Sequence, residues 1–300
     1  MDSGHHMDWM PILKIAIAFV ILVLASWSDW RSRMASDGFW IVMGTFGLVL
    51  LALQIYEAGV SPLYYLFLFP LGVFFYDIFW DHPGFHEKGG DEIALALFIS
   101  AFIVLGALLV IFWTDIFLWK LMSILIVFLV IILLYYFDIL KGGADAKALI
   151  AIALLFPTYP TFGEFPLIAI PSEAIQYLFP FAILVLFNAA LFLMIFPVSF
   201  AFLNAIRGDA KFPVMFFGYR MKIEDARKKF VWSMEQVEDG GRRISLFPRG
   251  DYEHDEVLDE LKAAGADRIW VTPKIPFLIP MTVSILFSAF VGNIFFYFMT

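Results

Sequence analysis

Two aspartates stand where apolar and polar segments meet, a place where carboxylates can do chemistry. Asp29 closes the first apolar run, in LASWSDWRSR, and Asp145 opens a later one, in GGADAKAL. An ionisable residue at the edge of a membrane segment is costly to desolvate and is therefore a candidate for function. Two carboxylates held close together cannot both ionise, so the pair keeps one proton. One can then take a proton from water while its protonated partner polarises a carbonyl, which is metal-free peptide hydrolysis.

Small and basic residues surround the second aspartate. Gly142 and Gly143 lack a Cβ atom, so a neighbouring helix or a substrate backbone can approach closely. A membrane protease needs that approach, because its substrate must unwind before it is cut. Lys147 follows two positions after Asp145, and its role is left open between anchoring at the cytoplasmic face and tuning the pair or holding a substrate carboxylate. Asp138, before the glycines, is a candidate supporting residue.

Each aspartate also has an ordinary structural interpretation. Asp29 can sit in the headgroup layer at a helix end, paired with Arg31 or Arg33. Asp145 can be the N-cap of the helix that follows it, since aspartate is a favoured N-cap residue. A cap and a catalytic acid are compatible roles for one side chain.

A second glycine motif competes with the first. Asp91, in HEKGGDEIALAL, also follows a glycine pair and opens an apolar segment, but Glu92 follows it and the trailing lysine is missing. We therefore take Asp91 as the alternative to Asp145. His82 and His86 have a spacing that binds zinc on a helix, yet a proline and a glycine lie between them and no H-E-x-x-H motif is present. We expect neither a metal nor another cofactor.

The composition predicts an integral membrane protein. Of its 300 residues, 62% are hydrophobic and only 16% are charged, whereas a soluble domain is about half apolar and about a quarter charged. The net charge of −8 does not set the orientation, because orientation follows the positions of Lys and Arg. The absence of cysteine excludes disulfides and thiol or Cys–metal chemistry. The start, MDSGHHM, looks like an expression tag, and we expect the fold to begin at residue 8.

The elements that must position the aspartates are membrane helices, about 20 apolar residues each. We expect about 6–8 transmembrane helices, the first a span rather than a removed signal peptide. The candidate segments in the sequence are 11–28, 38–57, 61–80, 92–113, 116–140, 145–157, 174–204 and 276–298.

The distribution of basic residues predicts an orientation with the N-terminus outside. The loop after the first segment, with Arg31 and Arg33, then lies on the cytoplasmic side, as do the loop at 81–91, the KGGADAK turn and residues 205–275. Both aspartates fall at the cytoplasmic edge of the hydrocarbon in this arrangement, where two packed helices can bring them face to face.

A polar stretch at 205–275 interrupts the apolar segments. IEDARKKF and DEVLDELKAAGADR have helical charge spacing, and the second reaches Gly265, a plausible stop. VWSMEQV, RRISLF and RIWVTP read as short strands around the turn signal EDGG. We therefore predict an all-α polytopic membrane protein with a membrane domain at 8–204, a small α+β cytoplasmic domain at 205–275, and a last transmembrane helix at 276–300.

Two motifs give this chain a resemblance to a known family. GGADAKAL resembles the G-x-G-D motif of polytopic aspartyl proteases, in the prepilin peptidase form with a lysine two positions after the aspartate. SDWRSRMASD is similar to the companion motif, an aspartate closing the first span before a basic stretch. The chain resembles the archaeal preflagellin (prearchaellin) peptidases and type IV prepilin peptidases, which also carry a small soluble domain before a last membrane helix.

The resemblance implies an aspartyl endopeptidase that removes the short basic leader of prearchaellins or prepilins at the cytoplasmic membrane face. Asp29 and Asp145 would be its catalytic pair. Two features depart from the family pattern: Ala144 stands where the motif has its second glycine, and the aspartates are more widely separated in sequence. The extra apolar segments between them favour a member larger than the minimal fold.

Two other functions remain as alternatives. A presenilin-like intramembrane aspartyl protease shares the glycine–aspartate chemistry but would cut near the middle of a substrate helix. A proton-coupled transporter would favour inverted repeats and acids near the midplane, and neither is evident in the sequence. The expected partners are the prearchaellin or prepilin substrates and the lipid bilayer, with no nucleic acid, and the sequence leaves the oligomeric state open.

Overall fold

The computed structural model describes residues 9–80, 92–140, 142–168, 179–238, 241–246 and 254–297. The chain divides into two compact units. Unit 1 comprises residues 1–189 and 276–300, and unit 2 comprises residues 190–275. The division lies inside an apolar helix, and the domain boundaries inferred from the sequence stay a prediction.

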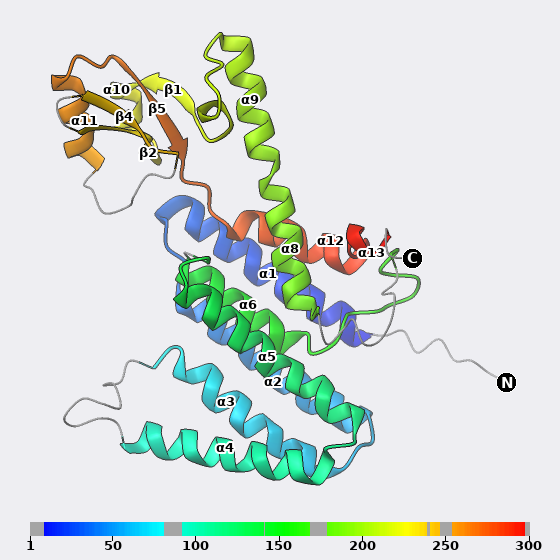
Figure 1. The fold of residues 1–300 in the computed structure, drawn as a ribbon. Helices are drawn as coiled ribbons and strands as arrows, with labels where there is room; N and C mark the ends of the chain where they lie inside the picture. Colours follow the sequence, from blue (N-terminus) through cyan, green and yellow to red (C-terminus); the bar gives the residue numbers. More distant parts are fainter. Residues whose placement is uncertain are drawn as a thin grey trace. The chain divides into compact units, whose positions relative to one another are not determined.

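Unit 1 is built from helices, drawn in Figure 1. They are α1 (Trp9–Ser32), α2 (Asp37–Glu57), η1 (Pro62–Phe67), α3 (Leu68–Asp77), α4 (Glu92–Phe112), α5 (Ile116–Tyr136), α6 (Gly143–Leu155), α8 (Phe181–Leu193, which runs into unit 2), α12 (Leu278–Phe290) and α13 (Ile294–Tyr297).

Five helices among the described residues are long and apolar enough to cross a membrane: α1, α2, α4, α5 and the run Phe181–Arg207. The predicted segments 61–80, 145–157 and 276–298 form shorter apolar helices instead. The prediction of a mostly helical, multi-pass membrane protein with a small α+β region before the last helix is confirmed.

Helix α6 is the buried centre of unit 1. Each residue from Ala148 to Leu155 is at most 2% exposed. The helix packs against α2 and α5 and also contacts α1 (Figure 1). At Gly47 of α2, an added Cβ atom would lie 2.9 Å from the backbone carbon of Leu154. The two backbones therefore approach closely, as small residues allow in membrane helix pairs.

Polar side chains link the C-terminal helices to the rest of unit 1. Helix α12 packs along α1, and the hydroxyls of Ser26 and Thr282 are 2.8 Å apart. The Asn188 amide of α8 donates to Ser288 Oγ at 2.9 Å and to the Gly292 carbonyl at 3.2 Å, just past the end of α12. Buried polar groups in a membrane need such partners, because the hydrocarbon offers none.

The long apolar run Phe181–Arg207 breaks at Met194 into α8 and α9 (Ile195–Arg207). Pro197 has no N–H to donate to the carbonyl one turn earlier, which accounts for the break. Helix α9 ends at Gly208, whose φ of 73° lies in the left-handed region, and the Asp209 N–H donates to the Asn204 carbonyl at 2.9 Å.

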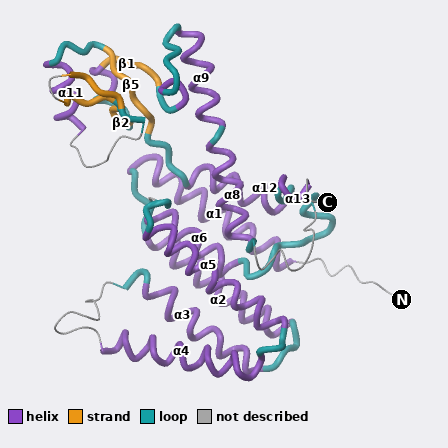
Figure 2. Tube along the Cα trace, in the orientation of Figure 1, coloured by secondary structure: helices purple, strands orange, loops and turns teal. Residues whose placement is uncertain are grey.

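Unit 2 is a small α+β domain, with its strands distinguished in Figure 2. A three-stranded antiparallel sheet has the order β1-β5-β2, and β3 pairs with β4 in a separate hairpin. Besides α9, its elements are η2 (Val214–Phe216), β1 (Tyr219–Lys222), α10 (Ile223–Ala226), β2 (Val231–Ser233), β3 (Glu235–Glu238), β4 (Gly241–Ile244), α11 (His254–Ala263) and β5 (Arg268–Pro273).

The local predictions for this stretch hold in part. RIWVTP forms β5, VWSMEQV divides at Met234 into β2 and β3 of different sheets, and β4 ends at Ile244 within RRISLF; α11 stops just before Gly265, whose φ is +80°. The predicted helix in IEDARKKF has only four residues, because the chain turns at once into β2. Strand β1 was missed, since its four residues, YRMK, are too few to give a clear strand signal in the sequence.

Candidate active site

Asp29 lies in the last turn of α1 and is partly buried. The helix ends just beyond it, where the Arg33 N–H donates to the Asp29 carbonyl at 2.9 Å. Arg33 has a φ of 57°, an uncommon conformation for a residue with a side chain. Its guanidinium also interacts electrostatically with the Asp29 carboxylate. Of the two arginines suggested as partners, Arg33 is therefore near enough for its charge to act on Asp29.

Asp145 lies in the first turn of α6 and is partly buried. Gly142 holds the N-cap position, so the interpretation of Asp145 as the N-cap itself is wrong. A carboxylate in the first turn of a helix is favoured by the helix dipole. A Cβ atom added at Gly142 would lie 2.0 Å from Oδ2 of Asp145. The carboxylate thus occupies the space that the missing side chain of Gly142 leaves open.

The fold brings these two aspartates together although they are far apart in the sequence. Helices α1 and α6 contact each other. The Asp29 carboxylate is close enough to Asp145 for the two charges to interact. Two acidic groups in such a place can share a proton. The geometry is compatible with a catalytic pair, and the catalytic role of the two residues stays a prediction.

The Lys147 side chain pairs with an acid other than Asp29 and Asp145. Its ammonium pairs with Oδ1 of Asp37 at 2.7 Å and lies 5.1 Å from the centre of the Phe79 ring. Asp37 is the first residue of α2, so this ion pair joins the start of α6 to the start of α2. Lys147 therefore connects the helix of Asp145 to the end of the loop that follows Asp29.

The sequence reasoning missed Asp37. A signal was present in the sequence, because Ser36 stands directly before the acidic Asp37. In the structure Ser36 caps α2 by accepting a hydrogen bond from the Gly38 N–H at 3.3 Å. Serine before an acidic residue marks a helix start. The cap places Asp37 at the beginning of α2, but its partner depends on how α2 and α6 pack.

The other motif residues have local roles. Ala144, which replaces a glycine of the family motif, packs its methyl group against the buried core. Near Gly143, an added Cβ atom would lie 3.6 Å from the Tyr135 hydroxyl, an ordinary contact. Asp138 ends α5 with a φ of 60°, where the next N–H, of Ile139, donates to the Leu134 carbonyl at 3.0 Å. This is the Schellman arrangement, with an aspartate where glycine is usual.

Some predicted residues lie outside the part of the chain that the structure describes. They are Asp91, the alternative to Asp145, and the histidines His82 and His86. Within the described ranges, no group of three or more His, Cys, Asp or Glu side chains could hold a metal ion.

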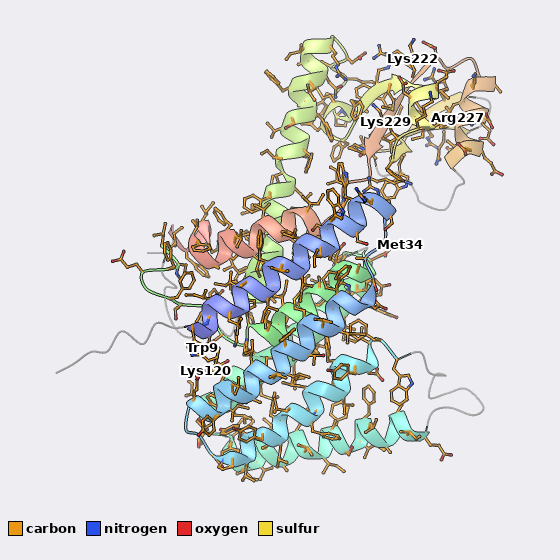
Figure 3. The ribbon with its side chains drawn as sticks, turned by 180° about the vertical axis from the view of Figure 1, so that it is seen from behind. Trp9, Met34, Lys120, Lys222, Arg227 and Lys229 are labelled. Atoms are coloured by element: carbon orange, nitrogen blue, oxygen red, sulfur yellow. The ribbon has the colours of Figure 1, made fainter. Side chains whose placement is uncertain are left out.

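The aspartates lie toward one end of unit 1. Figure 3 labels Trp9 at the start of α1 and Met34 just past its end, with Lys120 toward the Trp9 end. Asp29 lies five residues before Met34. Close to Asp29, Trp27 and Trp30 are 58% and 57% exposed. Exposed tryptophans are typical of the level where a membrane meets water.

Comparisons with known proteins point to one family. The family described as "Archaeal Peptidase A24 C-terminus Type II" matches residues 210–294, which cover most of unit 2 and all of α12. The preflagellin peptidase of Methanococcus maripaludis is 31% identical over 159 residues, 51% of this chain and 64% of that protein. The preflagellin peptidase of Methanocaldococcus jannaschii is 31% identical over 157 residues, 51% of this chain and 63% of that protein.

The chain is also similar, over a longer stretch, to an uncharacterized protein of Methanocaldococcus jannaschii. It is 24% identical over 262 residues, 85% of this chain and 84% of that protein. The matches to the preflagellin peptidases span less than two thirds of the length of those relatives. The resemblance seen in the two aspartate motifs agrees with these findings. The C-terminal part of the chain is thus similar to the archaeal peptidase A24 C-terminal family, and about half of the chain is similar to preflagellin peptidases.

Proposed function

We propose that this chain is a membrane aspartyl endopeptidase whose catalytic pair is Asp29 and Asp145. The observation that carries the proposal is the contact between α1 and α6, which brings the two carboxylates within reach of each other's charge. The proposed substrates are prearchaellins or type IV prepilins, which would lose their short leader. The preflagellin peptidases among the homologues support this substrate class.

The chemistry needs one shared proton and one water molecule. The ionised member of the pair takes a proton from water as the water oxygen attacks the carbonyl carbon of the scissile bond. The protonated member donates to the carbonyl oxygen and stabilises the charge that develops there. The tetrahedral intermediate then collapses: the C–N bond breaks, the amine leaves with a proton from the pair, and the pair returns to its singly protonated form.

The proposed orientation has the N-terminus outside and the active site near the cytoplasmic face. Arg31, Arg33 and Lys147 lie in the turns that carry the aspartates, and basic residues favour the cytoplasmic side. In this orientation residues 205–275 are cytoplasmic, and the leader is cut at the cytoplasmic membrane face, on the N-terminal side of the apolar helix of the substrate.

The test is cleavage of a prearchaellin and of a prepilin by membranes that contain the full chain. Asp29→Asn and Asp145→Asn are each expected to lower cleavage by about 10²- to 10⁴-fold, because each removes a group that must gain or lose a proton. Asp225→Asn, an exposed aspartate of unit 2, is the matched control and should keep its activity.

Asp91→Asn tests the choice between the two glycine motifs. An inactive Asp91→Asn variant beside an active Asp145→Asn variant would move the second catalytic acid to Asp91. Cleavage at the centre of a substrate helix, rather than at its cytoplasmic edge, would favour the presenilin-like alternative. No cleavage of either substrate by the unaltered chain would contradict the leader-peptidase proposal and favour a transporter.

A further inference from the structure

One face of the sheet in unit 2 exposes aromatic side chains at its β2 edge. Phe230 and Trp232 are 55% and 40% exposed, whereas Val231 and Ser233, which alternate with them, are 2% and 8% exposed. Successive strand residues point to opposite faces, so one face carries the core and the other carries the two rings. Neighbouring exposed rings rimmed by polar residues are a candidate interaction surface.

Lysines surround these rings. The Lys274 N–H donates to the Phe230 carbonyl at 2.9 Å, and its ammonium lies 5.1 Å from the centre of the Trp232 ring. Lys228 and Lys229 immediately precede Phe230 and are exposed. These five residues, Lys228, Lys229, Phe230, Trp232 and Lys274, form what we name the lysine–aromatic patch.

The lysines before Phe230 differ from the neighbouring arginine in their ion pairing. Arg227 pairs with Asp255 at 3.5 Å and also with Asp259. Among the described residues, neither Lys228 nor Lys229 takes part in an ion pair. The two lysines therefore add positive charge beside the rings that acids of the described part of unit 2 do not neutralise.

The covalent chain ties this patch to a membrane helix. Lys274 is four residues before Leu278, the first residue of α12. Four residues of extended chain reach at most about 14 Å. Helix α12 packs along the candidate span α1, and Thr282 in its second turn contacts Ser26, three residues before Asp29. Lys274 is thus separated by only a few residues of chain from a helix that packs on α1.

We propose that the lysine–aromatic patch binds the anionic headgroups of the membrane surface. Aromatic rings favour the level of the headgroups, and lysines are attracted by the negative surface charge of the membrane. Two features favour a lipid surface as the binding partner: the few residues of chain between Lys274 and α12, and the positive charge of Lys228 and Lys229 that acids of the described part of unit 2 do not neutralise. The interaction holds β2 and the end of β5 against the bilayer, and it does not depend on the proposed peptidase activity.

The chain contains no cysteine, so one introduced cysteine gives a unique labelling site. Thr272→Cys places an environment-sensitive fluorophore opposite Trp232 in the strand register. Glu260→Cys, exposed on α11, gives the control label. The full chain is reconstituted in vesicles of phosphatidylcholine alone or of phosphatidylcholine with phosphatidylglycerol, with a spin-labelled headgroup lipid as the quencher.

Headgroup quenching of the label at position 272 should increase when phosphatidylglycerol is present and should fall at high salt. The double variant Lys228→Glu and Lys229→Glu should lose it, since each lysine near a charged surface changes the equilibrium constant for surface binding by about fivefold. Lys262→Glu, a lysine of α11 that pairs with Glu224, is the matched control and should keep it.

Equal quenching in the two kinds of vesicle, or quenching that survives the double charge reversal, would overturn the proposal. A signal that appears only when a protein is added would mean that the patch binds a protein instead. Because the salt series uses the unaltered lysines, it tests the same interaction even where the double variant folds poorly.

Discussion

At the residue scale, the candidate site depends on a glycine that makes room for a carboxylate. The Asp145 side chain fills the space beside Gly142, whereas the space beside Gly143 is open enough for a methyl group. The two glycines of the motif are therefore unequal, although the sequence presents them as a pair.

Gly142→Ala is expected to displace the Asp145 carboxylate, because the added methyl group cannot share its position. A carboxylate is the free end of a flexible side chain, so the fold should tolerate the shift while cleavage falls by about a hundredfold. Leader cleavage and thermal unfolding in detergent measure the two effects. Gly143→Ala is the matched control and should stay active. Equal activity of the two variants would contradict this account.

The ion pair between Asp37 and Lys147 provides a second test at this scale. Because Asp37 is 51% exposed and Lys147 is 25% exposed, breaking the pair should cost only about 1 kcal/mol of stability. Asp37→Asn should nevertheless lower cleavage, since the pair fixes the start of α6 relative to the start of α2.

Exchanging the two charged residues tests whether cleavage depends on the ion pair itself or on which charge stands at each position. The double variant Asp37→Lys with Lys147→Asp should recover part of the activity that each single change removes. The equivalent exchange of Glu224 and Lys262, an exposed pair in unit 2, should change nothing. A double variant as inactive as the singles would show that the lysine acts on the substrate or on the aspartates directly.

At the element scale, the close approach of α2 and α6 sets where Asp145 lies. Gly47→Ala would put a methyl group against the backbone of α6, which cannot move aside as a side chain can. We expect a loss of about 1–3 kcal/mol in the free energy of unfolding. Gly106→Ala in α4, where nothing lies within 4 Å of the added atom, should be neutral or stabilising. Thermal unfolding in detergent compares the two.

A buried carboxylate links the two β-structures of unit 2. Glu235 is 3% exposed; its Oε2 accepts from Arg242 Nε at 3.0 Å, and its Oε1 accepts from the Trp270 N–H at 2.8 Å. Glu235→Ala leaves that N–H buried without a partner and should cost about 3 kcal/mol. Limited proteolysis should show faster cutting in unit 2 and unchanged protection of α6. Equal loss of protection in both units would mean that they unfold as one.

At the scale of the whole molecule, the sequence was most informative about segments with a strong local pattern. The apolar runs gave the long helices, and Gly265 correctly marked the end of α11. The existence of β1 was missed, because it depends on pairing with β5, which lies far along the chain. The length of α10 was missed, because the chain turns into β2 soon after it. Short elements of this kind are decided by tertiary contacts.

The candidate site shows the same contrast between features set by local sequence and features set by tertiary contacts. Asp29 and Asp145 could be singled out by motif and by position at helix ends. The pairing of Lys147 with Asp37 could not, since it requires the packing of α2 against α6. Nor could the sequence tell that Gly142, rather than Asp145, caps α6, because aspartate and glycine are both accepted at that position.

The length of α12 has a consequence for the surrounding lipid. Its 13 residues reach about 20 Å, whereas the hydrocarbon of a typical bilayer is about 30 Å thick. The Asn188 amide donates to the Gly292 carbonyl just past the end of α12, so this carbonyl has a hydrogen-bond partner without water. A helix that stops short in this way draws the two leaflets toward each other. The membrane around this protein should therefore be locally thin beside α12, and a substrate helix arriving there would have less hydrocarbon to cross.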